Sequence, residues 1–136
     1  MHALRGGLRG AIVNRLGVLP LYKRTLAAFI VLLLSAMPSI AETMNSSWYG
    51  PGFNGKMTAS GAIFNQNAMT AAHKTLPFGT RLKLTNSKNG KTACVTINDR
   101  GPYHGGRQLD VSKAAAVKLG FIGAGTAKLS VVRGGC

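Results

Sequence analysis

Residues 92–102, TACVTINDRGP, decide how the rest of the chain is arranged. Val95 and Ile97 alternate with polar residues, which is the period-two pattern of a strand with one buried face. The turn-forming sequence DRGP at 99–102 then ends this strand abruptly. The sequence therefore predicts that the carboxylate of Asp99 is presented at the end of a strand, next to Arg100.

The segments around this central strand are short and mostly extended. TRLKLT at 80–85 alternates like a strand, and the Asn-Gly pair at 89–90 predicts a tight hairpin turn into residues 92–99. Further short strands are expected at 48–49, 108–111 and 127–132. Ser112 is expected to cap a two-turn helix at 113–119, and Gly120 to end it. Five or so strands with one small helix predict a compact, mainly β barrel.

Residues 1–41 have the pattern of a signal peptide. Five basic residues precede the apolar stretch LAAFIVLLLSA at 26–36, which is shorter than the about 20 residues of a membrane span. Small residues at 39 and 41 predict cleavage after Ala41, with an uncleaved anchor as the alternative. Residues 42–136 would then form one small domain, periplasmic or secreted, with no stable membrane anchor after cleavage.

The predicted mature domain is strongly basic. Twelve of the seventeen Lys and Arg residues and all three acidic residues lie within 42–136, which gives this part a net charge of +9. An exported domain meets few nucleic acids, and no basic run here is interleaved with aromatic residues in a nucleic-acid motif. We therefore expect an acidic wall polymer as partner and no nucleic acid, or else a charge that serves solubility alone.

The two cysteines, Cys94 and Cys136, are expected to form a disulfide, because small exported domains are the setting in which cysteine pairs are oxidised. The bridge would join the central strand to the last residue of the chain. No metal site is expected, since the cysteines are far apart and the histidines lack ligand spacing. No other cofactor is indicated, and we expect a monomer.

Five segments, in this order and spacing, resemble the RlpA-like (rare lipoprotein A) proteins, which are relatives of expansins and barwin-type domains. They are SWYG at 47–50, TASG at 58–61, TAAHKTLPFGT at 70–80, VTINDRGP at 95–102 and GRQLDVSKAAAVKLG at 106–120. The resemblance covers residues 47–132. It implies a six-stranded double-psi β-barrel with one or two short helices, and an exported lytic transglycosylase that cleaves the glycan strands of peptidoglycan.

The resemblance also implies roles for individual residues. Asp99 matches the catalytic aspartate of the family and His73 its active-site histidine. Where the family carries a glutamate after TASG, this chain has Ala62. The candidates for substrate contact are Tyr49, Thr58, Asn98, Arg100 and Tyr103. Trp48 is expected in the core, whereas Tyr49 can either stack on a sugar ring or fill the core.

The small number of acids favours one type of glycan cleavage. Hydrolytic glycosidases usually need two carboxylates roughly 5–9.5 Å apart. A lytic transglycosylase uses the substrate's own C6 hydroxyl as the nucleophile, so one acid–base residue suffices. Only Glu42, Asp99 and Asp110 are acidic here. Asp110 is given a structural role, capping the helix or pairing with Arg100 or Arg107.

Two other functions remain open from the sequence. A non-catalytic, expansin-like module that binds and loosens the wall would need the same groove and positive charge, but no working acid. A secreted inhibitor of barwin type is the third hypothesis. Formation of 1,6-anhydro-muropeptides from peptidoglycan distinguishes the first function from the second.

Overall fold

The structure is a computed structural model that describes residues 39–136. Nearly all of the predicted signal peptide lies outside the described residues, so the leader and its cleavage after Ala41 remain predictions. Within residues 39–136, no helix is long and apolar enough to cross a membrane.

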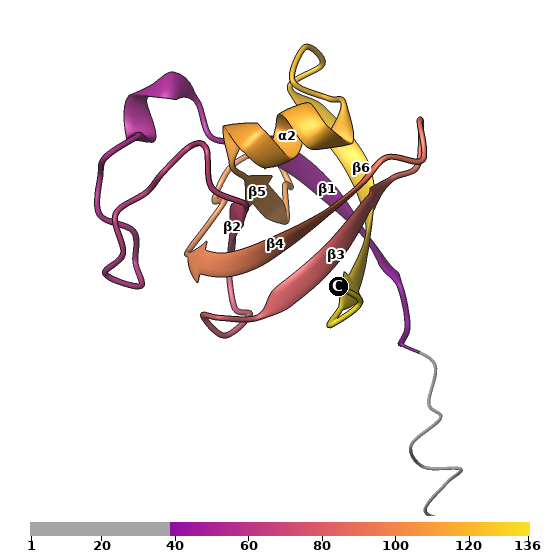
Figure 1. The fold of residues 1–136 in the computed structure, drawn as a ribbon, viewed down its shortest axis with the longest axis horizontal. Coiled ribbons are helices and arrows are strands. Elements are labelled where there is room, and N and C mark those ends of the chain that lie inside the picture. Colours follow the sequence, from indigo (N-terminus) through magenta and orange to yellow (C-terminus); the bar gives the residue numbers. More distant parts are fainter. Residues whose placement is uncertain (1–38) are drawn as a thin grey trace, which may run out of the picture. The chain divides into compact units, whose positions relative to one another are not determined.

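Within residues 39–136, six strands close into a barrel in the order β1-β5-β2-β4-β3-β6, with one α-helix beside them (Figure 1). The β1–β5 and β2–β4 pairs are parallel, and the other four are antiparallel. The elements are β1 (Glu42–Trp48), the 3-10 turn η1 (Pro51–Phe53), β2 (Thr70–His73), β3 (Arg81–Asn86), β4 (Thr92–Asp99), β5 (Leu109–Val111), α2 (Lys113–Leu119) and β6 (Thr126–Arg133). This architecture confirms the predicted mainly β barrel of six strands.

The elements predicted from local pattern lie where the sequence placed them. β3 and β4 pair through the hairpin, in which Gly90 takes the positive φ of 72° that its turn requires. Helix α2 begins after Ser112, whose hydroxyl accepts a hydrogen bond from the Ala115 amide at 3.3 Å. The helix ends at Gly120, which has a φ of 75°. A Cβ at Gly120 would also lie 2.7 Å from the Asn89 side chain.

Two strands differ from the expectation. β1 spans seven residues from Glu42, although only a short strand at 48–49 was predicted. Its polar residues Ser46 and Ser47 are buried because β5 and β6 flank β1 on both sides. β2 was not predicted as a strand, since its small TAAH sequence carries little alternation; the pairing with β4 and β5 makes it one.

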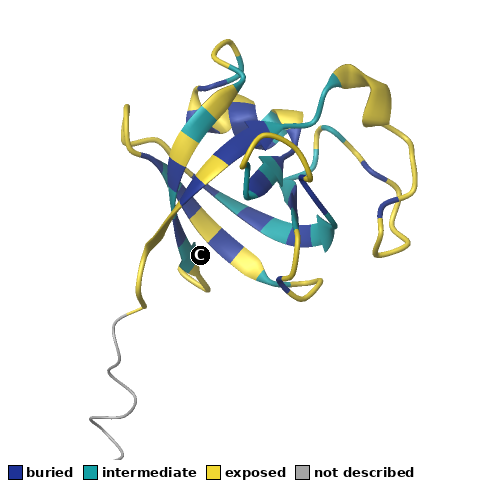
Figure 2. Cartoon of the chain, turned by 180° about the vertical axis from the view of Figure 1, so that it is seen from behind, coloured by how far each residue is buried: buried dark blue, intermediate teal, exposed yellow. Residues whose placement is uncertain are grey.

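The core fills the barrel with one face of each strand. Leu82 and Leu84 of β3 and Val95 and Ile97 of β4 are almost completely buried, and the alternation of buried and exposed bands follows the strands in Figure 2. Trp48 packs against this core and is partly buried, as expected. Because Ile97 is fixed in the core, the next residues of β4 emerge at one fixed edge of the barrel.

Cys94 in β4 and Cys136 form the predicted disulfide, with a Cα–Cα distance of 5.9 Å. The bond closes a loop with a sequence separation of 42. It therefore ties the last residue of the chain, which follows β6, to the central strand.

Cys94→Ser should lower the melting temperature strongly. The chain-entropy model assigns about 3–4 kcal/mol to a crosslink of this length. In a domain of this size, that corresponds to a fall of roughly 10 °C or more. Thermal unfolding followed by circular dichroism measures it, and Cys136→Ser should give the same fall. A melting temperature that reductant leaves unchanged in the unsubstituted protein would contradict the prediction.

Candidate functional site

Asp99 is the last residue of β4 and stands at one edge of the barrel. The parallel neighbour β2 brings Ala72 opposite Asp99, after a register shift between Ala71 and Ala72. His73, the last residue of β2, therefore lies at the same edge. The topology thus brings together two residues that are 26 positions apart in the sequence.

Three donors hold the Asp99 carboxylate. The Tyr49 hydroxyl donates to Oδ2 at 3.0 Å, and the backbone amides of Ala59 and Arg100 donate to Oδ1 at 2.9 and 2.8 Å. A carboxylate has about four acceptor positions. Oδ1 is thus occupied by two backbone donors, whereas Oδ2 keeps a position that a ligand can use.

Tyr49 positions this carboxylate. Its ring packs against the rings of Phe64 and Phe53, with centroid distances of 4.6 and 5.7 Å. Burial, reinforced by the negative charge of Asp99, raises the pKa of Tyr49 well above its ordinary value of 10.0. The hydroxyl therefore stays protonated and donates a hydrogen bond to Asp99. Tyr49 was predicted to stack on a sugar or fill the core, and its hydrogen bond to Asp99 was not foreseen.

His73 is held in one tautomer. Its Nδ1 accepts hydrogen bonds from the backbone amides of Thr75 and Leu76, at 3.1 and 3.0 Å. A neutral imidazole that accepts at Nδ1 carries its proton on Nε2. Burial lowers the pKa of His73 below its ordinary value of 6.5. The negative charge of Glu42 raises this pKa, whereas three neighbouring cations lower it further. His73 is thus a neutral donor through Nε2.

Arg100 links the two strand ends. Its Nη1 donates to the carbonyl oxygens of Leu76, at 2.8 Å, and His73, at 3.3 Å. The guanidinium carbon lies 3.9 Å from the centre of the Phe78 ring, which is a cation–π contact. Arg100 therefore fixes the segment after β2 against the end of β4, and through it the position of His73.

The other predicted contact residues differ in how accessible they are. Thr58 is buried, and its hydroxyl donates to the Ala62 carbonyl at 2.8 Å, so it shapes the turn that delivers the Ala59 amide to Asp99. The Asn98 side-chain oxygen is buried without a hydrogen-bond partner within the described residues. Tyr103 is 69% exposed, which leaves its ring open to a ligand.

The structural roles predicted for Asp110 need correction. It does not cap α2, because Ser112 does. Its Oδ1 accepts a hydrogen bond from the Ser47 hydroxyl at 3.1 Å, whereas Arg107 acts only through its charge. Burial raises the pKa of Asp110, and the charge of Asp99 raises it further. Asp110 is thus a neighbouring carboxylate within electrostatic reach of Asp99.

Asp110→Asn should stabilise the protein at neutral pH but not in acid. Because the pKa of Asp110 is raised in the folded state, folding favours the protonated form. The contribution of Asp110 to the free energy of unfolding is fully present below pH 3.8, which is the ordinary pKa of this carboxyl group. The contribution is lost as the pH rises through the higher pKa of the folded state. Asparagine resembles the protonated form and still accepts from Ser47.

Urea unfolding at about pH 3 and about pH 7 tests this linkage. The variant and the unsubstituted protein should unfold at similar urea concentrations in acid, and the variant at a higher one near neutrality. Glu42→Gln, at an exposed carboxylate, is the matched control and should change little at either pH. A variant less stable than the unsubstituted protein near neutrality would show that the charged form is favoured.

The described residues contain no group of three or more His, Cys, Asp or Glu side chains that could hold a metal ion. At the edge of the barrel, the structure brings together one well-oriented carboxylate, a neutral histidine donor and an orienting tyrosine.

Comparison with known proteins supplies a family and close relatives. Residues 41–131 match the family described as "Lytic transglycolase". The endolytic peptidoglycan transglycosylase RlpA of Neisseria meningitidis is 54% identical over 90 residues, which cover 66% of this chain and 38% of that protein. The probable endolytic peptidoglycan transglycosylase RlpA of Treponema pallidum is 52% identical over 114 residues, which cover 80% of this chain and 36% of that protein. The chain thus spans less than two fifths of the length of these relatives.

Solved structures share the fold at lower identity. The Streptomyces papain inhibitor superposes with a TM-score of 0.54 at 22% identity and covers 71% of this chain and 99% of its own. A Clavibacter michiganensis expansin in complex with cellohexaose gives a TM-score of 0.56 at 21% identity, over 69% of this chain and 50% of its own. At this identity the likeness concerns the fold alone.

Proposed function

Because this chain belongs to the RlpA-like family of double-psi β-barrel proteins, we propose that it is an exported lytic transglycosylase that cleaves the glycan strands of peptidoglycan. The observation that carries the proposal is the Asp99 carboxylate, held by three donors at a strand end with an acceptor position left on Oδ2. Such a group is positioned for proton transfer without any reorganisation of the site.

In the proposed reaction, Asp99 in its protonated form donates its proton to the glycosidic oxygen between N-acetylmuramic acid and N-acetylglucosamine. The bond from the muramic acid C1 to that oxygen breaks, and the C6 hydroxyl of the same ring attacks C1. The Asp99 carboxylate then takes the proton of that hydroxyl. The products are a 1,6-anhydro end and a free hydroxyl, so Asp99 regains its starting state and no water is consumed.

The surrounding residues have supporting tasks in this proposal. His73 offers Nε2–H as a donor to a sugar oxygen, because its Nδ1 is already occupied. Tyr49 and Arg100 orient the site, the first through Asp99 and the second through the backbone of His73. The half-buried side chain of Asn98 and the exposed ring of Tyr103 are the proposed substrate contacts. Thr58 shapes the turn beside them.

The proposed substrate also agrees with the charge. Peptidoglycan carries carboxylates, and the predicted mature domain has a net charge of +9. Exposed opposite charges raise the rate of encounter with such a polymer, an effect that salt weakens. We propose that the protein meets its substrate in the periplasm or outside the cell and acts there as a monomer.

Incubation with purified peptidoglycan tests the activity directly. The expected products are 1,6-anhydro-muropeptides, which are lighter by one water than the reducing-end products of a hydrolase and separate from them by liquid chromatography and mass spectrometry. Reducing-end products alone would contradict the transglycosylase assignment.

A non-catalytic wall-binding module is the second candidate function. The observation that favours it is Ala62, which ends the turn that Thr58 begins and leaves this turn without a carboxylate beside Asp99. Protein that co-sediments with peptidoglycan but releases no anhydro product would support this second function over the first.

A further inference from the structure

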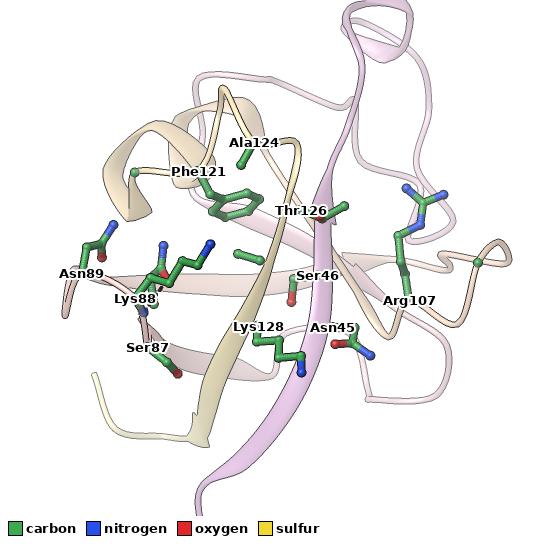
Figure 3. Close-up of a pocket in the computed structure, with 14 residues that line it drawn as sticks. Asn45, Ser46, Ser87, Lys88, Asn89, Arg107, Phe121, Ala124, Thr126 and Lys128 are labelled. Carbon is green, nitrogen blue, oxygen red and sulfur yellow. Dashed lines mark hydrogen bonds between the residues drawn. The ribbon is translucent and has the colours of Figure 1, made fainter.

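A hollow in the surface lies away from Asp99. Its volume is about 720 Å³, which is within the range of sites for small organic ligands. It is formed by β1, the β3–β4 hairpin, the loop before β5 and the segment from α2 into β6 (Figure 3). None of the residues proposed to act at Asp99 lines it.

The lining of this pocket is positive. It contains the side chains of Lys88, Arg107 and Lys128, and no Asp or Glu. Lys88 and Lys128 are exposed, so their ammonium groups are accessible to a ligand. Arg107 donates through Nε to the His104 carbonyl at 3.2 Å, which anchors the guanidinium and leaves its Nη groups as donors. Such a lining favours a negatively charged ligand.

The rest of the lining suits a sugar ring. Asn45, Ser87 and Thr126 are exposed and provide amide and hydroxyl groups for hydrogen bonds with sugar hydroxyls. The exposed Ala124 and the almost completely buried Phe121 make part of the wall apolar, which suits the C–H face of a pyranose. A site for a bare phosphate would need few of these polar and apolar side chains, since backbone amides suffice to bind that ion.

The pocket walls are fixed before any ligand arrives. Asn86 and Asn89 both donate to the Leu119 carbonyl, at 2.9 and 3.0 Å, which joins the hairpin to the end of α2. On the other side, Gln108 and Asn45 exchange two hydrogen bonds between the loop and β1. A preformed site loses less conformational entropy when it binds.

We propose that this pocket is a second, non-catalytic binding site for a sugar that carries a carboxylate, such as an N-acetylmuramic acid unit with a free lactyl group. Lys88, Lys128 and Arg107 would bind the carboxylate, and the polar rim would bind the ring. The inference rests on the proposed function only for the choice of polymer. Carbohydrate binding here requires no chemistry at Asp99.

The test compares two double variants with the same change in charge. Lys88→Gln with Lys128→Gln removes two cations from the pocket, and Lys83→Gln with Lys113→Gln removes two exposed cations outside it. Both are made in the Asp99→Asn protein so that no ligand is consumed. The probe is an oligosaccharide of alternating N-acetylglucosamine and N-acetylmuramic acid. Calorimetry fitted to two sites gives the dissociation constant of the pocket separately from that of the Asp99 site.

The pocket variant should bind about tenfold more weakly, whereas the control should stay within about twofold of the parent. In the parent, the probe should shift the backbone amide resonances of Gly105, Ala124 and Thr126, and an N-acetylglucosamine oligomer of equal length should not. Equal losses in both double variants would assign the affinity to diffuse charge and overturn the proposal. So would equal shifts with the neutral oligomer, or shifts with a sugar phosphate but not with the probe.

Failure of this proposal can be separated from failure of the proposed function. With Asp99 intact, the pocket variant should still release 1,6-anhydro products from peptidoglycan at saturating substrate, because no pocket residue takes part in proton transfer. A variant that loses product formation while keeping its affinity for the probe would overturn the pocket as a non-catalytic site.

Discussion

Asp99→Asn should abolish the release of 1,6-anhydro-muropeptides from peptidoglycan. Asparagine keeps the shape of the side chain but has no proton to give to the glycosidic oxygen and cannot take one from the C6 hydroxyl. General acid–base catalysis is typically worth 10²–10⁴-fold, so the rate should fall by about this factor. Quantitative mass spectrometry of the soluble products measures the fall.

The fold should survive this substitution. The asparagine Oδ1 can still accept from the backbone amides of Ala59 and Arg100, which hold Oδ1 of the aspartate at 2.9 and 2.8 Å. The melting temperature should therefore change little. Glu42→Gln, which exchanges an exposed carboxylate of β1 for the same amide group, is the control and should retain activity.

Asp110→Asn tells whether one carboxylate is enough. The proposed reaction uses Asp99 alone, so this variant should keep most of its activity at neutral pH. A loss as large as that of Asp99→Asn would mean that the two neighbouring carboxylates work as a pair and would contradict the single-residue mechanism.

The local elements of the fold could be predicted because their signals lie within a few residues. The alternation in β3 and β4, the Asn-Gly turn and the Ser112 cap each depend on neighbouring residues only. β2 depends on partners far away in the sequence, because Thr70–His73 becomes a strand through pairing with β4 and β5. Burial of Ser46 in β1 has the same origin, and no local pattern encodes it.

The candidate site could be predicted only in part for a related reason. Asp99 was identifiable because acids are scarce and a turn follows the strand. The amide of Ala59 was not, since every residue but proline has the same backbone donor and its orientation is a property of the turn. The link between Tyr49 and Asp99 joins residues 50 positions apart. Likewise, the pocket lined by Lys88, Arg107 and Lys128 combines side chains from four segments. None of these segments has a local sequence pattern that predicts a binding site.

Ala62→Glu should increase the rate of anhydro product formation by about tenfold or more. This increase is smaller than the full rate enhancement that an acid–base group commonly supplies. Ala62 is exposed and lies in the turn that Thr58 closes. The amide of Ala59 in this turn donates to Asp99 at 2.9 Å, so the turn is tied to the proposed acid. A glutamate there introduces a negative charge near Asp99. Two neighbouring carboxylates share a proton to higher pH than one does.

The pH dependence separates this effect from a simple change in substrate contact. If the added carboxylate acts by keeping a proton in the pair, the upper limb of the rate profile should move to higher pH. Ala62→Gln is the matched control, because it adds the same length without charge and should leave both rate and profile unchanged. Equal activity of the two variants would mean that a carboxylate at this position does not couple to Asp99. The unsubstituted protein and Ala62→Glu could both bind peptidoglycan and release no anhydro product. The wall-binding function would then be the better account, because a carboxylate at position 62 would not produce glycan cleavage.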